Sequence, residues 1–142
     1  MPSVIAEYHP DTFEEFFAEP LKDFPELADD LLADFVRYKS KDELPSTFGR
    51  DAPYIQPYAA YRAHLMHIHL KLPPEVFPER LPQIDRTCTK KRDAALVYVR
   101  GELEENRYCI FGVLYPNAHA KAREEKVMRY LARMAQGFRD TH

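Results

Sequence analysis

Two strongly apolar segments in the second half of the chain constrain its fold more than any other feature. Residues 94–100, AALVYVR, and 107–115, RYCIFGVLY, are rich in the β-branched and aromatic side chains that favour strands. The residues between them, GELEEN, are of the polar kind that forms turns. The two segments therefore predict an antiparallel hairpin, and Pro116 ends its second strand.

Helical periodicity appears on both sides of this hairpin. Between Phe24 and Tyr38 apolar residues recur every three or four positions, which predicts a helix with one stripe against a core. A similar stripe after Asn117, an N-cap residue, predicts a C-terminal helix with a basic outer face. Residues 11–19 begin with Asp-Thr and end before Pro20, so we expect a short helix there.

A further strand is predicted at residues 64–70, HLMHIHL, which hold three of the six histidines. Alternate side chains of a strand project from the same face, so His67 and His69 are expected side by side. Such a pair can be a metal site, an acid–base pair or two surface histidines.

Two connecting segments hold half of the twelve prolines. Residues 46–58 predict an irregular turn that carries Arg50. Residues 71–93 predict a long loop, which we expect to form a flap beside the site. The basic run near the end of this loop consists of Lys90, Lys91 and Arg92.

The predicted order is helix, helix, strand, long loop, strand, strand and helix. This order predicts an α+β fold, with helices packed on one side of a small antiparallel sheet of about three or four strands. A chain of 142 residues, 45% hydrophobic, is long enough for one core. It has no segment able to cross a bilayer and no signal peptide, so we expect a cytoplasmic protein that binds no membrane.

Charge is distributed unevenly, although the net charge is only -3. Residues 1–34 hold one Lys and ten acidic residues, a net charge of -9. Residues 35–142 hold 19 basic and 13 acidic residues, a net charge of +6. A basic body suits a polyanionic partner, whereas any single cation can also be ordinary solvated surface charge.

Several motifs in this order resemble the YafO toxins, which belong with the RelE-like toxins of bacterial type II toxin–antitoxin systems. The motifs are DFVRYKSKDELPSTFGRDAPY (34–54), HIHL (67–70), Arg86-Thr87, LVY (96–98) and HAKAR (119–123). The resemblance covers roughly residues 24–139. We therefore expect residues 1–23 to be an acidic extension and residues 24–142 to be a RelE-like toxin domain. The extension would lie across a cationic cleft or add surface for a partner.

The resemblance implies a RelE/ParE-like fold and an endoribonuclease that cuts mRNA on the ribosome, inhibits translation and is silenced by a cognate antitoxin. It implies a cleft on the sheet face next to the last helix and no cofactor. RelE has two alternating lysines where this chain has His67 and His69, and an arginine where it has Ala95. A phosphate contact must therefore come from elsewhere in this chain or be missing.

RNA cleavage without a metal needs a base for the 2′-hydroxyl, cations for the phosphate and an acid for the leaving 5′-oxygen. Histidine can fill either proton-transfer role near neutral pH. We expect His67 or His69 to act with His119, because the start of a helix favours neutral imidazole and attracts phosphate. The sequence does not decide which histidine is base and which is acid.

Basic side chains near these histidines are expected to hold phosphate. Arg86 is grouped with the catalytic histidines. The further RNA-binding candidates are Arg50, Lys90, Lys91, Arg92 and Arg123. Any of them can instead be solvated or paired surface charge, and Arg123 has Glu124 and Glu125 beside it.

Two other functions fit the same residues. His67, His69 and His119 could form a three-histidine zinc or iron site, although a cupin-like fold would need more strands than we predict. A non-catalytic inhibitor that binds a protein target, as the related ParE toxins do, would use the same scaffold, because one fold can host several functions.

Overall fold

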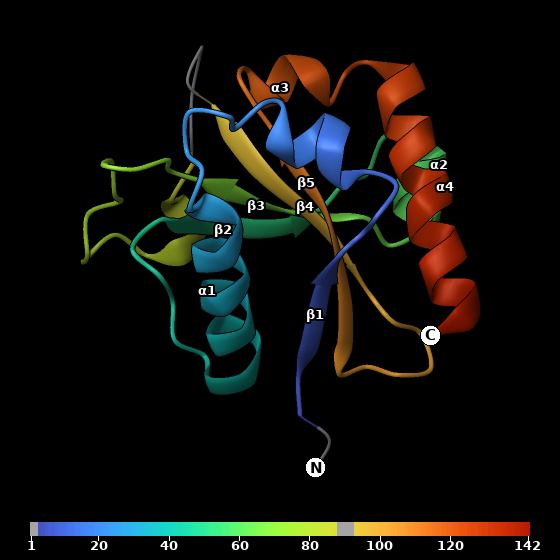
Figure 1. Cartoon of the computed structure of the whole chain (residues 1–142), viewed down its shortest axis with the longest axis horizontal. Coiled ribbons are helices and arrows are strands. Elements are labelled where there is room, and N and C mark those ends of the chain that lie inside the picture. Colours follow the sequence, from blue (N-terminus) through green and yellow to red (C-terminus); the bar gives the residue numbers. More distant parts are fainter. Residues whose placement is uncertain (1–2, 88–92) are drawn as a thin grey trace.

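A five-stranded sheet forms the centre of the protein (Figure 1), whose computed structural model describes residues 3–87 and 93–142. The strand order is β1-β5-β4-β3-β2. β1 runs parallel to β5, and the other neighbouring strands are antiparallel. The strands are β1 (Ile5–Tyr8), β2 (Phe48–Pro53), β3 (Met66–Leu70), β4 (Ala94–Arg100) and β5 (Arg107–Leu114).

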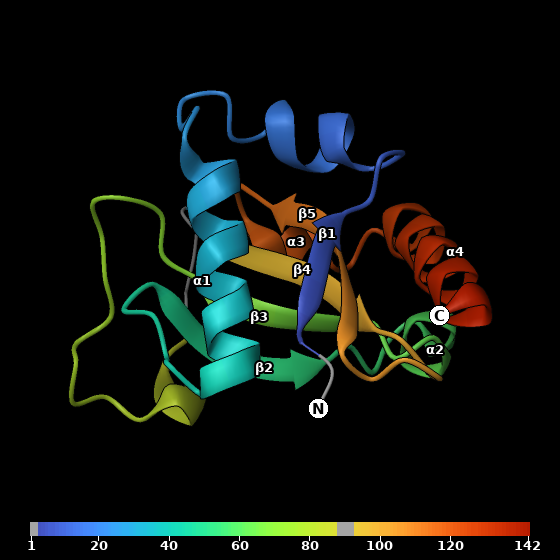
Figure 2. The same cartoon turned by 60° about the horizontal axis from the view of Figure 1, so that its bottom comes forward.

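Helices cover both faces of this sheet, which passes between α1 and α4 in Figure 2. The helices are α1 (Leu27–Lys41), α2 (Tyr58–Arg62), α3 (Ala118–Lys121) and α4 (Glu125–Thr141). Two short helical turns are η1 (Glu14–Ala18), of π type, and η2 (Gln83–Asp85), of 3₁₀ type. Among the described residues, no helix has the length and apolar character needed to cross a bilayer.

Alternating side chains divide the core into two halves. In β4, Val97 and Val99 pack with α2 and α4, whereas Leu96 and Tyr98 pack with α1. Burying a side chain of this size typically contributes about 1.5–3 kcal/mol. Both faces are therefore largely apolar, and a polar group placed there is costly unless it finds a partner.

Several predicted elements are confirmed. The hairpin is formed by β4 and β5, the amphipathic segment at 24–38 contains most of α1, and β3 covers the end of the histidine strand. Asn117 caps α3, because its side chain accepts a hydrogen bond from the Ala120 N–H at 3.4 Å. The predicted C-terminal helix is divided into α3 and α4.

The predicted sheet was too small, and its covering was wrong. The sheet has five strands, it is mixed rather than antiparallel, and helices lie on both of its faces. One missed strand is β2, inside the segment predicted as an irregular turn. A Cβ on Gly49 would lie 2.3 Å from the Arg86 carbonyl oxygen, so a residue typical of turns is needed for close packing within this strand.

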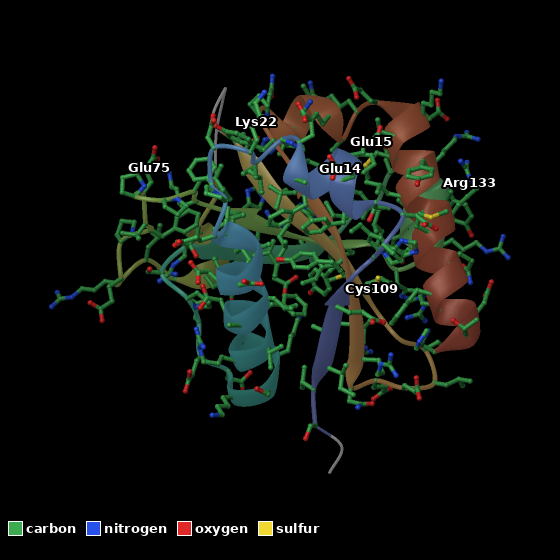
Figure 3. The ribbon with its side chains drawn as sticks, viewed as in Figure 1. Glu14, Glu15, Lys22, Glu75, Cys109 and Arg133 are labelled. Atoms are coloured by element: carbon green, nitrogen blue, oxygen red, sulfur yellow. The ribbon has the colours of Figure 1, made fainter. Side chains whose placement is uncertain are left out.

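The other missed strand is β1, and with it the acidic N-terminal segment joins the sheet. Figure 3 shows Glu14 and Glu15 on η1, which packs against β5. The close contact is made at Gly112, where φ is +147° and a Cβ would lie 2.4 Å from the Phe16 carbonyl oxygen. The described part of residues 1–23 is therefore packed on the fold, while the division into extension and toxin domain remains a prediction.

Candidate active site

Three histidines lie in a row on the sheet face that α3 and α4 cover. His67 and His69 project from the same face of β3, and His119 reaches them from α3. The ring centroids of His67 and His69 are 5.5 Å apart, and those of His69 and His119 are 5.8 Å apart. The geometry therefore brings together the three histidines that the sequence singled out.

These rings line a small niche, which we call the histidine niche, with a cavity of about 30 Å³. Its lining is His67, His69, His119, Tyr54, Asp93, Ala95, Ala118 and Ala122. Tyr54 stacks on His67, with the ring centroids 4.0 Å apart and the planes 13° from parallel. The alanine side chains are apolar, so the polar groups of the niche come from the three imidazoles, the Asp93 carboxylate and Tyr54.

Asp93 holds His119 in place from the base of the niche. Its carboxylate contacts His119 Nδ1 and also accepts a hydrogen bond from the His119 backbone N–H at 3.2 Å. Its carbonyl accepts the Ala118 N–H at 3.1 Å, so Asp93 fixes the first turn of α3 as well. A carboxylate bound to one imidazole nitrogen orients the ring and leaves the other nitrogen for chemistry. His119 Nε2 is therefore the atom available to exchange a proton.

The niche holds buried polar atoms without partners. Within residues 3–87 and 93–142, three buried side-chain polar atoms have no hydrogen-bond partner: His67 Nδ1, Asp93 Oδ1 and Arg107 Nε. Two of these three belong to the histidine niche. Such atoms are rare because each costs about 1–3 kcal/mol, and they indicate a site kept for something other than stability.

The two strand histidines are held in their neutral form at pH 7. Burial, together with the nearby His69, lowers the pKa of His67 to about 4, although the charge of Asp51 acts in the opposite direction. Burial also lowers the pKa of His69, while Asp93 opposes this change. The positive charge of Arg50 acts on both rings in the lowering direction. Among the described residues, Arg50 is thus a cation close enough to act on both imidazoles.

Arg50 owes its position to a bulge in β2. The register between β2 and β3 shifts between Phe48 and Asp51. The Arg50 N–H donates to the Arg86 carbonyl at 2.8 Å instead of to a neighbouring strand, and Gln83 Nε2 donates to the Gly49 carbonyl at 3.0 Å. The bulge places the exposed Arg50 between Phe48 and Asp51, whose side chains both lie on the α1 face.

A second polar cluster lies directly behind the niche, on the α1 face. We call it the Asp51 cluster; its members are Asp51, Tyr38, Lys39, Gln83 and Tyr98. Asp51 accepts hydrogen bonds from the hydroxyls of Tyr98 and Tyr38, both at 2.7 Å, and from Lys39 Nζ at 3.2 Å. Lys39 also donates to the Tyr98 hydroxyl at 2.8 Å, and Gln83 donates to that of Tyr38 at 2.8 Å. This cluster ties α1 to β2 and β4.

Arg86 lies apart from the histidine niche, although the sequence grouped it with the catalytic residues. It is 5% exposed, and its guanidinium donates to five backbone carbonyls at 2.9–3.5 Å. The acceptors are the carbonyls of Leu81, Pro45, Phe48, Pro78 and Glu79. A direct phosphate contact would require these bonds to open, so this placement favours a role in fixing the loop and the bulge. The described part of the loop is accordingly anchored to β2.

The structure says less about the remaining basic candidates. Arg123 is exposed in the turn between α3 and α4, next to Ala122 of the niche. The basic run at residues 90–92, which contributed Lys90, Lys91 and Arg92, lies outside the described residues. Roles in catalysis or RNA binding remain predictions for all the site residues.

Sequence reasoning missed Asp93 and Tyr54. Asp93 stands directly before the apolar strand 94–100, and an acid at the edge of a buried strand was the available signal. Tyr54 carried no signal, because it lies in the Pro-rich segment predicted to be irregular. Its burial to 8% exposure depends on tertiary packing against β3 and α2.

Comparisons with known proteins agree with the resemblance in the motifs. The sequence model of a family described as "Toxin YafO, type II toxin-antitoxin system" matches residues 36–140. The mRNA interferase toxin YafO of Escherichia coli (strain K12) is 36% identical over 117 residues, which are 80% of this chain and 86% of that protein. No solved structure matches the chain.

Proposed function

Because the chain belongs to the YafO family of type II toxin–antitoxin toxins and is an mRNA interferase, an endoribonuclease, we propose that the histidine niche is where it cuts RNA. The reaction is attack of a ribose 2′-oxygen on the adjacent phosphorus. A bond forms from the 2′-oxygen to phosphorus, and the bond from phosphorus to the 5′-oxygen breaks. The products are a 2′,3′-cyclic phosphate and a 5′-hydroxyl end.

His119 is the general base. Asp93 fixes its Nδ1 side, so Nε2 faces the niche and takes the proton from the 2′-hydroxyl. The buried carboxylate, 1% exposed, also stabilises the positive charge that the ring gains with this proton. The side chain of His119 is 57% exposed, which leaves room for a nucleotide beside it.

His69 is the general acid once RNA is bound. In the free protein its lowered pKa keeps it neutral, and a neutral imidazole is a poor acid for the leaving oxygen. A phosphate anion within a few ångströms favours the protonated ring and raises this pKa. Substrate binding thus charges His69, which then gives its proton to the 5′-oxygen. This coupling restricts the acid to the bound state.

Arg50 and His67 complete the site. Arg50 is an exposed cation whose charge acts on both imidazoles, and its guanidinium neutralises the charge that builds on the phosphate oxygens. His67, stacked on Tyr54, stays neutral and packs beside His69, so it shapes the niche around the reacting imidazoles. Arg86 acts indirectly, by fixing the loop and the β2 bulge that carries Arg50.

The setting follows from the family. As a type II toxin the protein has a cognate antitoxin and acts on mRNA. We infer further that it adopts the RelE/ParE-like variant of the α+β fold, that it cuts message held on the ribosome, and that it works in the cytoplasm. The five-stranded sheet with a C-terminal helix beside the niche supports the first of these inferences.

The two alternative functions have less support. Membership of an mRNA interferase family speaks against a non-catalytic inhibitor of a protein target. For a three-histidine metal site, no group of three or more His, Cys, Asp or Glu side chains in residues 3–87 and 93–142 is arranged to hold a metal ion. Metal analysis of protein purified without an affinity tag tests this alternative directly.

The observation that carries the proposal is the meeting of three imidazoles and one buried carboxylate in one niche. The test is to cut a reporter message in a translation extract and to identify the chemical ends. Acid–base transesterification leaves 2′,3′-cyclic phosphate and 5′-hydroxyl ends. A 3′-hydroxyl paired with a 5′-phosphate would contradict it, because those ends require attack by water rather than by the 2′-oxygen.

A further inference from the structure

A large groove runs between α2 and α4, outside the histidine niche. Its volume is about 860 Å³, compared with about 30 Å³ for the niche. We call it the arginine groove, because its charged lining consists of Arg62, Arg129, Arg133, Arg139 and a single acid, Glu102. Figure 3 shows Arg133 projecting from α4. The groove is therefore cationic in a protein whose net charge is -3.

Two of these four arginines are paired with described residues, and the other two make no ion pair with any of them. Arg129 is paired with Glu125 at 2.8 Å, and Arg139 bonds the Arg100 carbonyl at 2.8 Å and lies 3.8 Å from Glu102. Arg62 and Arg133, in contrast, have no ion pair with any residue that the structure describes. Arg133 instead lies over the ring of Tyr130, 5.7 Å from its centroid. Unpaired guanidinium groups in one groove are suited to a partner that carries repeated negative charge.

Aromatic rings stand at the edge of the same groove. Tyr58 lines it and is 71% exposed, and Tyr61 of the same helix is 52% exposed. Their ring centroids are 6.5 Å apart. Large aromatic side chains left in water on a five-residue helix add no stability through burial, so their exposure calls for another explanation. Tyrosine faces beside arginines are the combination on which unpaired bases stack.

The groove and the niche lie on the same face of the sheet. The side chains of Tyr54, which lines the niche, and of Ala63, which lines the groove, pack in one apolar cluster. On the other wall, Ala122 of the niche precedes α4, and Arg129 of the groove lies within that helix. The histidine niche and the arginine groove therefore lie on one face and share the elements that bound them, as one extended substrate path would require.

We propose that the arginine groove holds the single-stranded message beyond the scissile phosphate, with Arg62 and Arg133 on phosphates and Tyr58 stacked on a base. This inference rests on the proposed function of the niche, since it extends the same substrate path. The exposed tyrosines favour RNA over an acidic segment of a protein partner, because a carboxylate chain offers no planar base to stack on.

The experiment measures equilibrium binding of RNA in which every 2′-oxygen is methylated, so that no cleavage occurs. A labelled 12-nucleotide strand is titrated with the full-length protein across a salt series, and a trinucleotide serves as the short probe. The double variant Arg62→Gln/Arg133→Gln should bind the 12-mer about tenfold more weakly. Its salt slope should fall by about 1.4, because each phosphate contact on a single strand contributes about 0.7. Trinucleotide binding should be unchanged.

The matched control is Lys22→Gln/Arg80→Gln, which removes the same charge from exposed positions outside the groove. It should lose much less affinity and keep the salt slope. Tyr58→Ala should weaken 12-mer binding about tenfold with no change in salt slope, since stacking releases no counterions. Comparison of Arg62→Gln/Arg133→Gln with Tyr58→Ala therefore separates the contribution of charge from that of stacking.

Two results would overturn the proposal. One is a 12-mer affinity and salt slope in Arg62→Gln/Arg133→Gln equal to those of the control variant. The other is unchanged RNA binding together with lost binding of a polyglutamate peptide, which would assign the groove to an acidic protein partner. Neither depends on the chemistry of the niche: loss of cleavage in a niche variant with intact 12-mer binding leaves the groove in place.

Discussion

The two faces of the sheet at β2 and β3 each carry a polar cluster, and the clusters differ in how well their members are paired. In the Asp51 cluster on the α1 face, every member makes at least one hydrogen bond within the cluster. In the histidine niche on the other face, His67 Nδ1 and Asp93 Oδ1 are buried with no partner among the described residues. The same part of the sheet thus carries a fully paired polar cluster on one face and a partly unpaired one on the other.

This difference indicates what each cluster is for. A buried polar group with its partners fixes one arrangement of the core, and removing a partner is strongly destabilising. A buried polar group without partners costs free energy of folding, and it can regain that cost when a ligand supplies the missing hydrogen bond. We therefore expect changes in the Asp51 cluster to alter stability and changes in the niche to alter activity.

The largest effect is expected from the proposed acid. His69→Asn should lower the cleavage rate of a reporter message about a thousandfold, within the usual range for loss of an acid or base. The free energy of unfolding should change by less than about 1 kcal/mol. Burial lowers the pKa of His69, so the native ring is neutral, and Asn replaces it with another neutral polar group. Mapped transcript ends in a translation extract give the rate, and urea titration gives the stability.

The control for this variant is His9→Asn, on a histidine that lies between β1 and η1 and outside the niche. It should cut at nearly the wild-type rate. Equal rates for the two variants, with both folded, would remove the distinction between the niche and the rest of the molecule.

A smaller loss is expected from the residue that positions the base. Asp93→Asn keeps the shape of the side chain but presents an amide to His119 Nδ1, which disturbs the tautomer and orientation of the ring. Cleavage should fall about a hundredfold. In a His119→Asn background the same change should have almost no further effect, because the two residues act as one unit. Fully additive losses would show that Asp93 acts on the fold alone.

The opposite pattern is expected on the α1 face. Asp51→Ala removes the acceptor shared by Tyr38, Lys39 and Tyr98, and Lys39 would be left half-buried without its counter-charge. The free energy of unfolding should fall by about 2–3 kcal/mol, with allowance for partial exposure of the pair. Exposed Asp30→Ala should change it by less than about 0.5 kcal/mol. If the Asp51→Ala protein were as stable as the wild type but no longer cut RNA, catalysis would depend on the α1 face and not on the histidine niche.

The smallest expected effect is the pH dependence of stability that His67 causes in the niche. The pKa of His67 is about 4 in the folded protein and 6.5 in the unfolded chain. The unfolded state therefore binds more protons between these values, and wild-type stability must fall as the pH drops through this window. From pH 7 to pH 5 the loss should be about 1–2 kcal/mol.

His67→Phe supplies the matched control, because it keeps the ring stacked on Tyr54 and removes the titrating group. The variant should be about 1 kcal/mol more stable at pH 7, since an unpaired polar atom is gone. Urea titrations at several pH values should show a flatter profile for it than for the wild type. Parallel profiles would mean that His67 is not buried in its neutral form.

The sequence predicted those parts of the molecule in which local pattern and final structure agree. Strong β propensity located the hairpin, and the three-four spacing located α1 and α4. Alternation placed His67 and His69 on one face, because side chains two residues apart in a strand project from the same side. The start of α3 was marked by Asn117, which brought His119 into consideration.

The remaining parts depend on contacts between distant segments. β1 is only four residues long and forms by pairing with β5, and β2 contains a bulge whose glycine resembles a turn signal. The structural role of Arg86 was missed because its five backbone acceptors come from two distant segments, three from the loop at residues 78–81 and two from Pro45, before β2, and Phe48, its first residue, and the sequence does not show that these segments meet. Asp93 was missed for the same reason: its partner, His119, is 26 residues away.

The central claim is that the scissile phosphate binds in the histidine niche between His69 and His119. The most direct test follows the imidazole NMR signals of all six histidines while a 2′-O-methylated dinucleotide is added across a pH series. We expect the signals of His69 and His119 to shift together at saturation and the pKa of His69 to rise, with His9 and His142 unaffected. Saturable binding that shifts only histidines outside the niche would contradict the claim.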